Sequence, residues 1–465
     1  MSRHKFAVMP VHFSSPVPPA RATNSALPVE SDANWLVEIG PATVNAPLIK
    51  SGSSVPARRF LMHLDRLGPL NFAILFTLFC ASAVWLVGGL VTSWWWHPPG
   101  FVNDLGADIG RDFIIFYSGS TAVLAGHAGA VYNSDAFHAI NETVIGAPVA
   151  PFAFLYPPTY LLLLAPLALA PYLVSLVLWL AVPLLALMRF LRRIMPHPLT
   201  PLVALIFPGT SQCLLSGQNG ILSALMLAGG LLNLEKRPVF AGLIFAFLSY
   251  KPHLAIAVFA VLFFGRHWRA LSSALIGTAI LGVASVAAFG IEPWAAFFAS
   301  FGETRMIIET GVVPWDRMVS IFAAARLAGL GITASYLLQI AVALGTLATL
   351  AWTWRRRNGS LALRGSVLII AIPLMTPYVY DYDLVMLLLP IAWLVRAGMA
   401  VGFRRGEAAL LAAAWACPVA GWLFAEWSHL QVTPIVLMLL LCTTARCVAA
   451  DTGSDEGHLS GVLTT

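Results

Sequence analysis

The sequence predicts an all-α protein that crosses a membrane many times. Residues 71–91 (NFAILFTLFCASAVWLVGGLV) carry no charge over a length that spans a bilayer as a helix. Of the 465 residues, 59% are hydrophobic and 10% are charged, and the mean hydropathy is +0.81, a balance that soluble domains do not carry. The apolar runs together predict about 11–13 transmembrane helices.

The distribution of basic residues predicts how the chain is oriented. The net charge of +6 comes from short Lys and Arg clusters between apolar runs, so it does not indicate a nucleic-acid partner. Cytoplasmic loops carry an excess of Lys and Arg. Because Arg58, Arg59 and Arg66 precede the first span, we expect a multi-pass protein of the cell membrane with a cytoplasmic N-terminus.

The two ends of the chain differ in composition from the apolar body. Residues 1–57 are rich in Pro, Ser, Ala and Val without a sustained period, and residues 450–465 are polar. We expect disordered tails at both ends, the first of them cytoplasmic, around a transmembrane domain at 58–449. The five cysteines lie in or beside apolar runs and predict neither a disulfide framework nor a zinc site.

A polar and aromatic segment at 94–157 follows the first span and predicts a large helical extracytoplasmic loop. Residues 112–126 place aromatic and small residues at helical spacing, which predicts a helix lying along the membrane surface. A second short helix is expected at 134–144, opened by Ser134 or Asp135. A loop of this size suits a membrane enzyme better than a plain pore.

Two later regions predict broken helices. Residues 157–188 are too long for one span, and we expect one span plus a half-helix broken at Pro166 or Pro171. Residues 238–264 fit two short spans or a re-entrant hairpin with its apex at Lys251-Pro252. Non-helical backbone at membrane depth is tolerated where it lines a cavity or is buried in protein.

Asp112 is the first candidate for chemistry. It can simply cap the helix that follows it, because a carboxylate is favoured at a helix N-terminus. It can also act as a general base, because partial burial raises a carboxylate pKa toward the operating range. The two interpretations are compatible. Asp104 and Asp108 are rivals in a less patterned stretch of the same loop.

Lys251 and the GQN sequence at 217–219 are candidates for binding. Lys251 interrupts two apolar runs, where it either snorkels to the interface or binds a phosphate. His253 beside it fits a core histidine that is hydrogen-bonded, although it is close enough in sequence to assist. Gln218 and Asn219 form either a polar turn or a pair of amides facing a sugar or pyrophosphate.

An acidic pair enters a later apolar run. Burying Asp381 and Asp383 of PYVYDYDLVML in a membrane costs free energy unless the two side chains line a polar cavity. Tyr156, in the YPP sequence, sets the entry of the next span. The chain lacks a Walker A sequence, a Rossmann fingerprint, HExxH and GxSxG.

Five sequences in order resemble glycosyltransferase family 87. They are DFIIFYSGSTAVLAGHAGAVY, FLYPPTYLLLLAPLALAP, LLSGQNGIL, FLSYKPHLAI and GRHWRAL, within residues 70–400. The family comprises polyprenol-phosphate-sugar-dependent transferases with the GT-C membrane fold, including mycobacterial mannosyltransferases of phosphatidylinositol mannoside synthesis. The resemblance implies a GT-C-type bundle, a lipid-phosphate-linked sugar donor and a reaction on the extracytoplasmic face.

The resemblance also implies roles for particular residues. The catalytic aspartate maps onto Asp112, and the YPP, GQN and KP positions map onto Tyr156, Gln218, Asn219 and Lys251. The remaining candidate substrate-binding residues are Tyr117, His253, Asp381, Asp383 and Arg111.

The sequence thus leads to one preferred function and to alternatives. We expect an inverting transfer of a sugar, by default mannose, from a polyprenyl phosphate to a hydroxyl of a lipid or glycan acceptor. Asp112 would take the acceptor proton, and Lys251 with Arg111 or Arg305 would hold the leaving phosphate. This chemistry requires neither a cofactor nor a metal. The alternatives are a transporter or flippase of a lipid-linked sugar and a non-catalytic assembly subunit.

Overall fold

The computed structural model describes residues 68–95, 101–103, 108–356 and 360–451. Within those ranges the protein is 78% helical and has no strands, and only two isolated bridges pair extended residues, Val102 with Asp108 and Met318 with Tyr380. The predicted all-α fold is therefore confirmed. The expected tail at 1–57, most of the tail at 450–465, and Asp104 lie outside the described residues.

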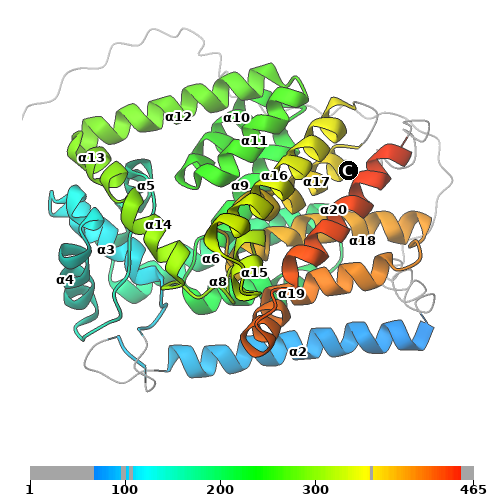
Figure 1. Cartoon of the computed structure of the whole chain (residues 1–465), viewed down its shortest axis with the longest axis horizontal. Helices are drawn as coiled ribbons and strands as arrows, with labels where there is room; N and C mark the ends of the chain where they lie inside the picture. Colours follow the sequence, from blue (N-terminus) through cyan, green and yellow to red (C-terminus); the bar gives the residue numbers. More distant parts are fainter. Residues whose placement is uncertain (1–67, 96–100, 104–107, 357–359, 452–465) are drawn as a thin grey trace, which may run out of the picture. The chain divides into compact units, whose positions relative to one another are not determined.

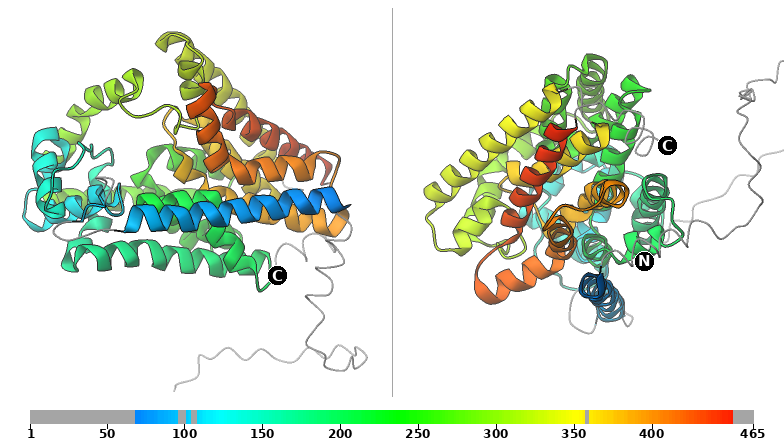
Figure 2. Two further views of the ribbon diagram at one scale, coloured as in Figure 1. Left: turned by 90° about the horizontal axis from the view of Figure 1, so that it is seen from below. Right: turned by 90° about the vertical axis from the view of Figure 1, so that its right-hand side faces the viewer.

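Within the described ranges, seven helices are long and apolar enough to cross a membrane. Figure 1 and Figure 2 show α2 along one edge of the bundle that the others form. The seven are α2 (Gly68–Trp94), α6 (Tyr172–Ile194), α12 (Trp268–Phe289), α16 (Ile332–Arg355), α18 (Leu388–Val401) preceded by the 3-10 helix η5 (Asp381–Leu387), α19 (Glu407–Ser428) and α20 (Thr433–Ala450).

Shorter apolar helices account for much of the rest of the chain. The long helices alone do not reach the expected count of about 11–13 spans, because several apolar runs are divided by proline or glycine into pieces of 10–17 residues. These pieces are α3 (Phe113–Leu124), α5 (Pro158–Leu164) with η3 (Leu167–Leu169), α9 (Gly220–Asn233), α10 (Pro238–Phe247) with η4 (Leu248–Tyr250), α11 (Pro252–Phe264) and α17 (Leu361–Met375).

The remaining helices are short connectors. They are η2 (Ala128–Tyr132), α4 (Ser134–Ile145), α7 (Thr200–Ile206), α8 (Pro208–Ser216), α13 (Glu292–Ala299), α14 (Phe301–Thr310) and α15 (Ile321–Leu327).

Both expected helix breaks are confirmed. The chain leaves α5 at Pro166, passes through η3, and starts α6 directly after Pro171. The second break separates η4 from α11 at Lys251, and Pro252 occupies the first position of α11. Proline is favoured at that position because the N–H it lacks would have no helical partner there.

The loop after α2 contains both expected helices, with two corrections. The helix α3 does not present one apolar face, because Phe113, Ile114, Ile115 and Phe116 are all buried in succession. It packs against α4, α5, η2 and η3 and so forms part of a core, not a surface helix. The helix α4 is capped by Asn133, whose Oδ1 accepts from Ala136 N at 2.9 Å, and not by Ser134 or Asp135.

Two clusters of buried side chains meet where the candidate residues lie. The larger cluster is centred on α17, whose residues from Ala362 to Leu374 are all buried, and includes Tyr382 of η5. The smaller one surrounds α3 and α5 and includes Tyr250 of η4. The short elements η4, η5 and the α8–α9 turn therefore bring polar residues to the boundary between two apolar cores.

Candidate active site

Asp112 occupies the position before α3, but its carboxylate does not cap that helix. The preceding turn uses positive φ angles at Gly110 (78°) and Arg111 (41°). The Asp112 side chain makes no hydrogen bond to the N-terminus of α3. Instead, Gln218 Nε2 donates to Asp112 Oδ2 at 2.7 Å. Capping alone therefore does not explain the residue.

The GQN turn between α8 and α9 is packed directly on the Asp112 segment. Gly217 has a φ of 65°, and a Cβ there would lie 2.3 Å from Gly110 O and 2.6 Å from the Phe113 Cβ. Trp179 Nε1 donates to Gly217 O at 3.2 Å. The turn thus needs glycine both for its backbone angle and for this close approach.

Asn219 connects the turn to a group of stacked tyrosines. Its Nδ2 donates to the hydroxyls of Tyr156 at 3.0 Å and Tyr160 at 2.9 Å. The Tyr160 ring stacks on Tyr250 with ring centroids 4.5 Å apart, and the Tyr250 hydroxyl lies 2.6 Å from Ser223 Oγ. The Asn219 Oδ1 is buried and has no hydrogen-bond partner among the described residues.

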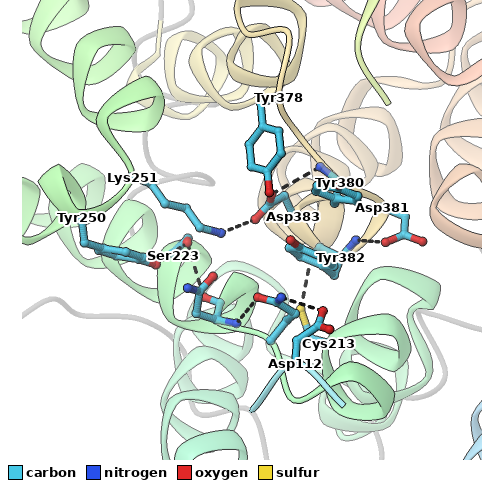
Figure 3. Close-up of polar contacts among 12 residues, drawn as sticks. Asp112, Cys213, Ser223, Tyr250, Lys251, Tyr378, Tyr380, Asp381, Tyr382 and Asp383 are labelled. Atoms are coloured by element: carbon cyan, nitrogen blue, oxygen red, sulfur yellow. Dashed lines mark hydrogen bonds and ion pairs between the residues drawn. The ribbon is translucent and has the colours of Figure 1, made fainter. Parts of the chain in front are cut away.

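Lys251 forms a buried ion pair with Asp383. The Lys251 Nζ and Asp383 Oδ1 atoms are 2.5 Å apart, and the two side chains are only 5% and 4% exposed. Figure 3 shows the lysine pointing at this carboxylate, beside Tyr378 and Tyr382. The alternative of a snorkelling lysine is therefore wrong, because the ammonium is directed into the protein.

Asp381 is held by a second cation. Arg317 donates to both carboxylate oxygens of Asp381, from Nε and Nη2, each at 3.0 Å. Gln212 Nε2 donates to Asp381 Oδ2 at 2.8 Å. Asp381 is 1% exposed, whereas the Arg317 side chain is 22% exposed, and the Arg317 guanidinium also lies 5.4 Å from the centroid of the Trp422 ring.

The electrostatics of the Asp112 carboxyl follow from its burial. Burial raises the pKa of Asp112, while the Gln218 hydrogen bond and the charge of Arg317 oppose that rise. The negative charge of Asp381 adds to it. Asp108, four residues earlier in the chain, has its pKa raised to about 7, mainly by burial.

Several residues predicted from the sequence are not part of this arrangement. The Tyr117 hydroxyl donates to Ala170 O at 2.9 Å, which is a structural contact. The Arg111 side chain is exposed, and Arg305 pairs with Glu309 at 2.7 Å on the surface. His253 Nε2 is buried without a hydrogen-bond partner among the described residues, so the expected satisfied histidine is not observed.

Other residues of the site were missed by the sequence analysis. They are Arg317, Gln212 and Tyr160. The sequence carried a signal for Arg317. The positive-inside pattern puts its stretch on the outward side, where basic residues are less frequent, so an arginine there indicates a specific role. Gln212 and Tyr160 gave no signal, because each lies next to other polar residues of a short helix and no spacing or charge distinguishes it from them.

The fold and the site define a class of protein first. The protein is a multi-pass helical membrane protein. It buries paired charges beside a further carboxylate, and these groups form a polar site at the edge of its apolar cores. The comparison with family models then gives the particular family. Residues 154–377 match the model of glycosyltransferase family 87, and this match supports a membrane glycosyltransferase.

The extent of the match matters for the site. The matched residues include Tyr156, Gln218, Asn219, Lys251 and Arg317, whereas Asp112, Asp381 and Asp383 lie outside them. Neither the search of curated proteins nor the search of solved structures gives a significant match. In the part of the chain that the structure describes, no group of three or more His, Cys, Asp or Glu side chains is arranged to hold a metal ion.

Proposed function

We propose that this glycosyltransferase moves one sugar, by default mannose, from a polyprenyl-phosphate donor to a hydroxyl of a lipid or glycan acceptor, with inversion at the anomeric carbon. Asp112 is the general base. The observation that carries the proposal is the Asp112 carboxylate itself, which is hydrogen-bonded by Gln218 and is not used to cap its own helix. The reaction takes place on the extracytoplasmic face of the cell membrane.

The position of Asp112 suits proton removal. A general base works best when its pKa lies near the operating pH, and burial moves the pKa of this carboxyl upward in that direction. Gln218 leaves the Oδ1 atom of Asp112 without an amide donor, so that oxygen can accept the proton of an incoming hydroxyl. As the new C–O bond forms, the bond between the anomeric carbon and the donor phosphate breaks, and the phosphate leaves with the electron pair.

Lys251 and Arg317 are the cations that suit the donor phosphate. An ammonium has three N–H donors and a guanidinium has five. Asp381 uses two of the five N–H donors of Arg317. The Arg317 side chain is also more exposed than that of Lys251. We therefore assign the main phosphate contact to Arg317 and a supporting one to Lys251, in place of Arg111 or Arg305. No cofactor enters the proposed reaction.

The test of the general base is the variant Asp112→Asn. The amide oxygen can still accept from Gln218, so the local geometry is retained while the basic group is lost. We expect transfer by the purified protein to fall by roughly 10²–10⁴-fold, with donor binding unchanged. The matched control is Asp135→Asn, which removes an exposed aspartate of α4. Transfer at the parent rate by Asp112→Asn would remove Asp112 from the reaction.

The same preparation separates a transferase from a carrier of lipid-linked sugars. The protein is reconstituted in vesicles with a labelled polyprenyl-phosphate sugar and cell lipids, and the products are analysed by mass spectrometry. We expect a new glycosidic bond. Movement of the unaltered donor across the bilayer, without such a bond, would contradict the proposal.

A further inference from the structure

A second polar and aromatic surface lies at the other end of α11. It is a pocket with a volume of about 520 Å³ at the turn between α11 and α12, beside the last residue of α16. It is lined by Phe263, Phe264, Gly265, Arg266, Trp268 and Arg355. None of these residues contributes to the site around Asp112.

The pocket is far from the candidate active site, as the lengths of α11 and α12 show. Lys251 immediately precedes α11, and the pocket begins at the last residues of that helix, so the rise over 13 residues puts them about 20 Å apart. Helix α12 starts at the pocket with Trp268 and, after 22 residues, about 33 Å, ends beside α13. Figure 1 shows α13 with α3, α4 and α5, away from the end of α16 that leads to α17. The pocket and the α3–α4 layer therefore lie at opposite ends of α12, a helix that is long and apolar enough to cross a membrane.

The pocket combines positive charge with exposed aromatic rings. Phe263 and Trp268 are each 52% exposed, and their ring centroids are 5.4 Å apart. The Arg355 guanidinium lies over the Phe264 ring at 5.5 Å. Among the described residues, neither Arg266 nor Arg355 has a carboxylate within ion-pair distance. Their charge is therefore available to an anion from outside the chain.

The backbone fixes the position of Arg266. Its φ of 55° is rare for a residue with a side chain, and a set of hydrogen bonds holds it. Arg266 N donates to Phe263 O at 3.1 Å, and His267 N donates to Leu262 O at 2.8 Å. A glycine would adopt this angle with less strain, so an arginine at this position costs stability.

We propose that this pocket binds the phosphate headgroup of an anionic membrane lipid. Arg266 and Arg355 contact the phosphate, and the Phe263 and Trp268 rings contact the first part of the lipid chains. Basic pockets between transmembrane helices bind anionic headgroups in this way, and tryptophan is favoured at the level of the headgroups. Free phosphate has no apolar part for the two rings to contact. The proposal is independent of the sugar transfer.

The experiment compares lipid binding by the full-length protein and its variants, using native mass spectrometry with phosphatidylglycerol and phosphatidylcholine. We expect the double variant Arg266→Gln/Arg355→Gln to bind phosphatidylglycerol roughly thirtyfold more weakly, because each arginine near the membrane surface contributes about fivefold. Phosphatidylcholine binding stays unchanged. The matched control is Arg192→Gln/Arg405→Gln, which removes two exposed arginines elsewhere and retains the binding.

Further arms identify the source of the phosphate and guard against misfolding. Glycerol phosphate at millimolar concentration should not displace the lipid, and displacement would overturn the assignment to a lipid. Equal phosphatidylglycerol affinity of parent and Gln variant would also overturn it. If the double variant does not fold, Arg355→Gln alone, at an exposed helix end, is measured instead and is expected to lose about fivefold.

Discussion

At the scale of single residues, the site holds more carboxylates than positively charged side chains. Three carboxylates, on Asp112, Asp381 and Asp383, face two cations, on Lys251 and Arg317. Each cation is paired with its own acid, and Asp112 has an amide as its hydrogen-bond partner. Among these contacts, Asp112 is the one carboxylate of the three that forms no ion pair. The protonation of Asp112 is therefore sensitive to small changes in its surroundings.

The first residue-scale prediction concerns the pH dependence of transfer. A general base is active when deprotonated, so activity is lost as the pH falls through the pKa of Asp112. Because burial raises that pKa, the acid limb of kcat/KM lies at higher pH than for an exposed aspartate, whose pKa is about 3.9.

Gln218→Leu tests this cause directly. It removes the hydrogen bond that lowers the Asp112 pKa, so the acid limb moves to higher pH. The control Asn233→Leu removes an amide of α9 that donates to Gly229 O and leaves the limb in place. A pH profile identical to the parent's in Gln218→Leu would mean that another group sets the acid limb.

The second residue-scale prediction concerns Arg317. Arg317→Lys keeps the positive charge but cannot serve both Asp381 oxygens and a phosphate at once. The donor KM should rise roughly ten- to hundredfold, in line with the loss of one charge-assisted hydrogen bond, with a smaller change in kcat. The control is Arg305→Lys on the surface. A change in kcat alone would instead place Arg317 in the chemical step.

At the scale of elements, turns and not helix faces bring the site together. Asp112 follows a turn with two positive φ angles, Gln218 follows Gly217, Lys251 separates η4 from α11, and Asp381 begins η5. The sequence predicted these breaks because proline and glycine interrupt the apolar runs there. It did not predict that the α8–α9 turn packs on the Asp112 turn, because that contact joins segments about a hundred residues apart.

The element-scale prediction follows from that contact. Gly217→Ala places a Cβ against Gly110 O and Phe113 and forces a positive φ on alanine. Strain and crowding together should cost roughly 2–5 kcal/mol and separate Gln218 from Asp112, so both the melting temperature and the transfer rate fall.

The matched control for this variant is Gly126→Ala. Gly126 also has a positive φ, 79°, but a Cβ there meets nothing within 4 Å. It should therefore cost only the backbone strain, roughly 1–2 kcal/mol, and leave transfer unchanged. Equal effects in the two variants would mean that the close packing of Gly217 has no role in forming the site.

At the scale of the whole molecule, composition and the first apolar run were enough to predict the all-α membrane fold. The count of spans was harder to predict, because apolar runs such as 238–264 are divided into helices too short to cross a bilayer alone, and hydropathy does not distinguish these from full spans. The candidate site brings together residues that the sequence analysis named and others that it did not. Gln218, Asn219 and Lys251 stood out as polar residues in apolar surroundings, and Asp112 stood out before a patterned helix. The sequence did not show that Arg317 lies beside Asp381, a contact next to the Met318–Tyr380 bridge between distant segments.

The last prediction concerns the orientation of the molecule in the membrane. Helix α12 carries Arg269 in its first turn and is about 33 Å long, which matches the thickness of the hydrocarbon core. Its other end contacts α13, which packs on η2 beside α4. Arg269 and Asp135 of α4 should therefore lie on opposite sides of the membrane, with the arginine in the cytoplasm.

Cysteine labelling tests this orientation in intact cells. The five native cysteines are replaced by alanine, and Asp135→Cys or Arg269→Cys is added at an exposed position. A membrane-impermeant maleimide should label the first variant from outside and the second only after permeabilisation. Labelling of both variants from the same side would mean that α12 does not cross the bilayer. The reverse pattern would put Asp112 and the proposed sugar transfer on the cytoplasmic face.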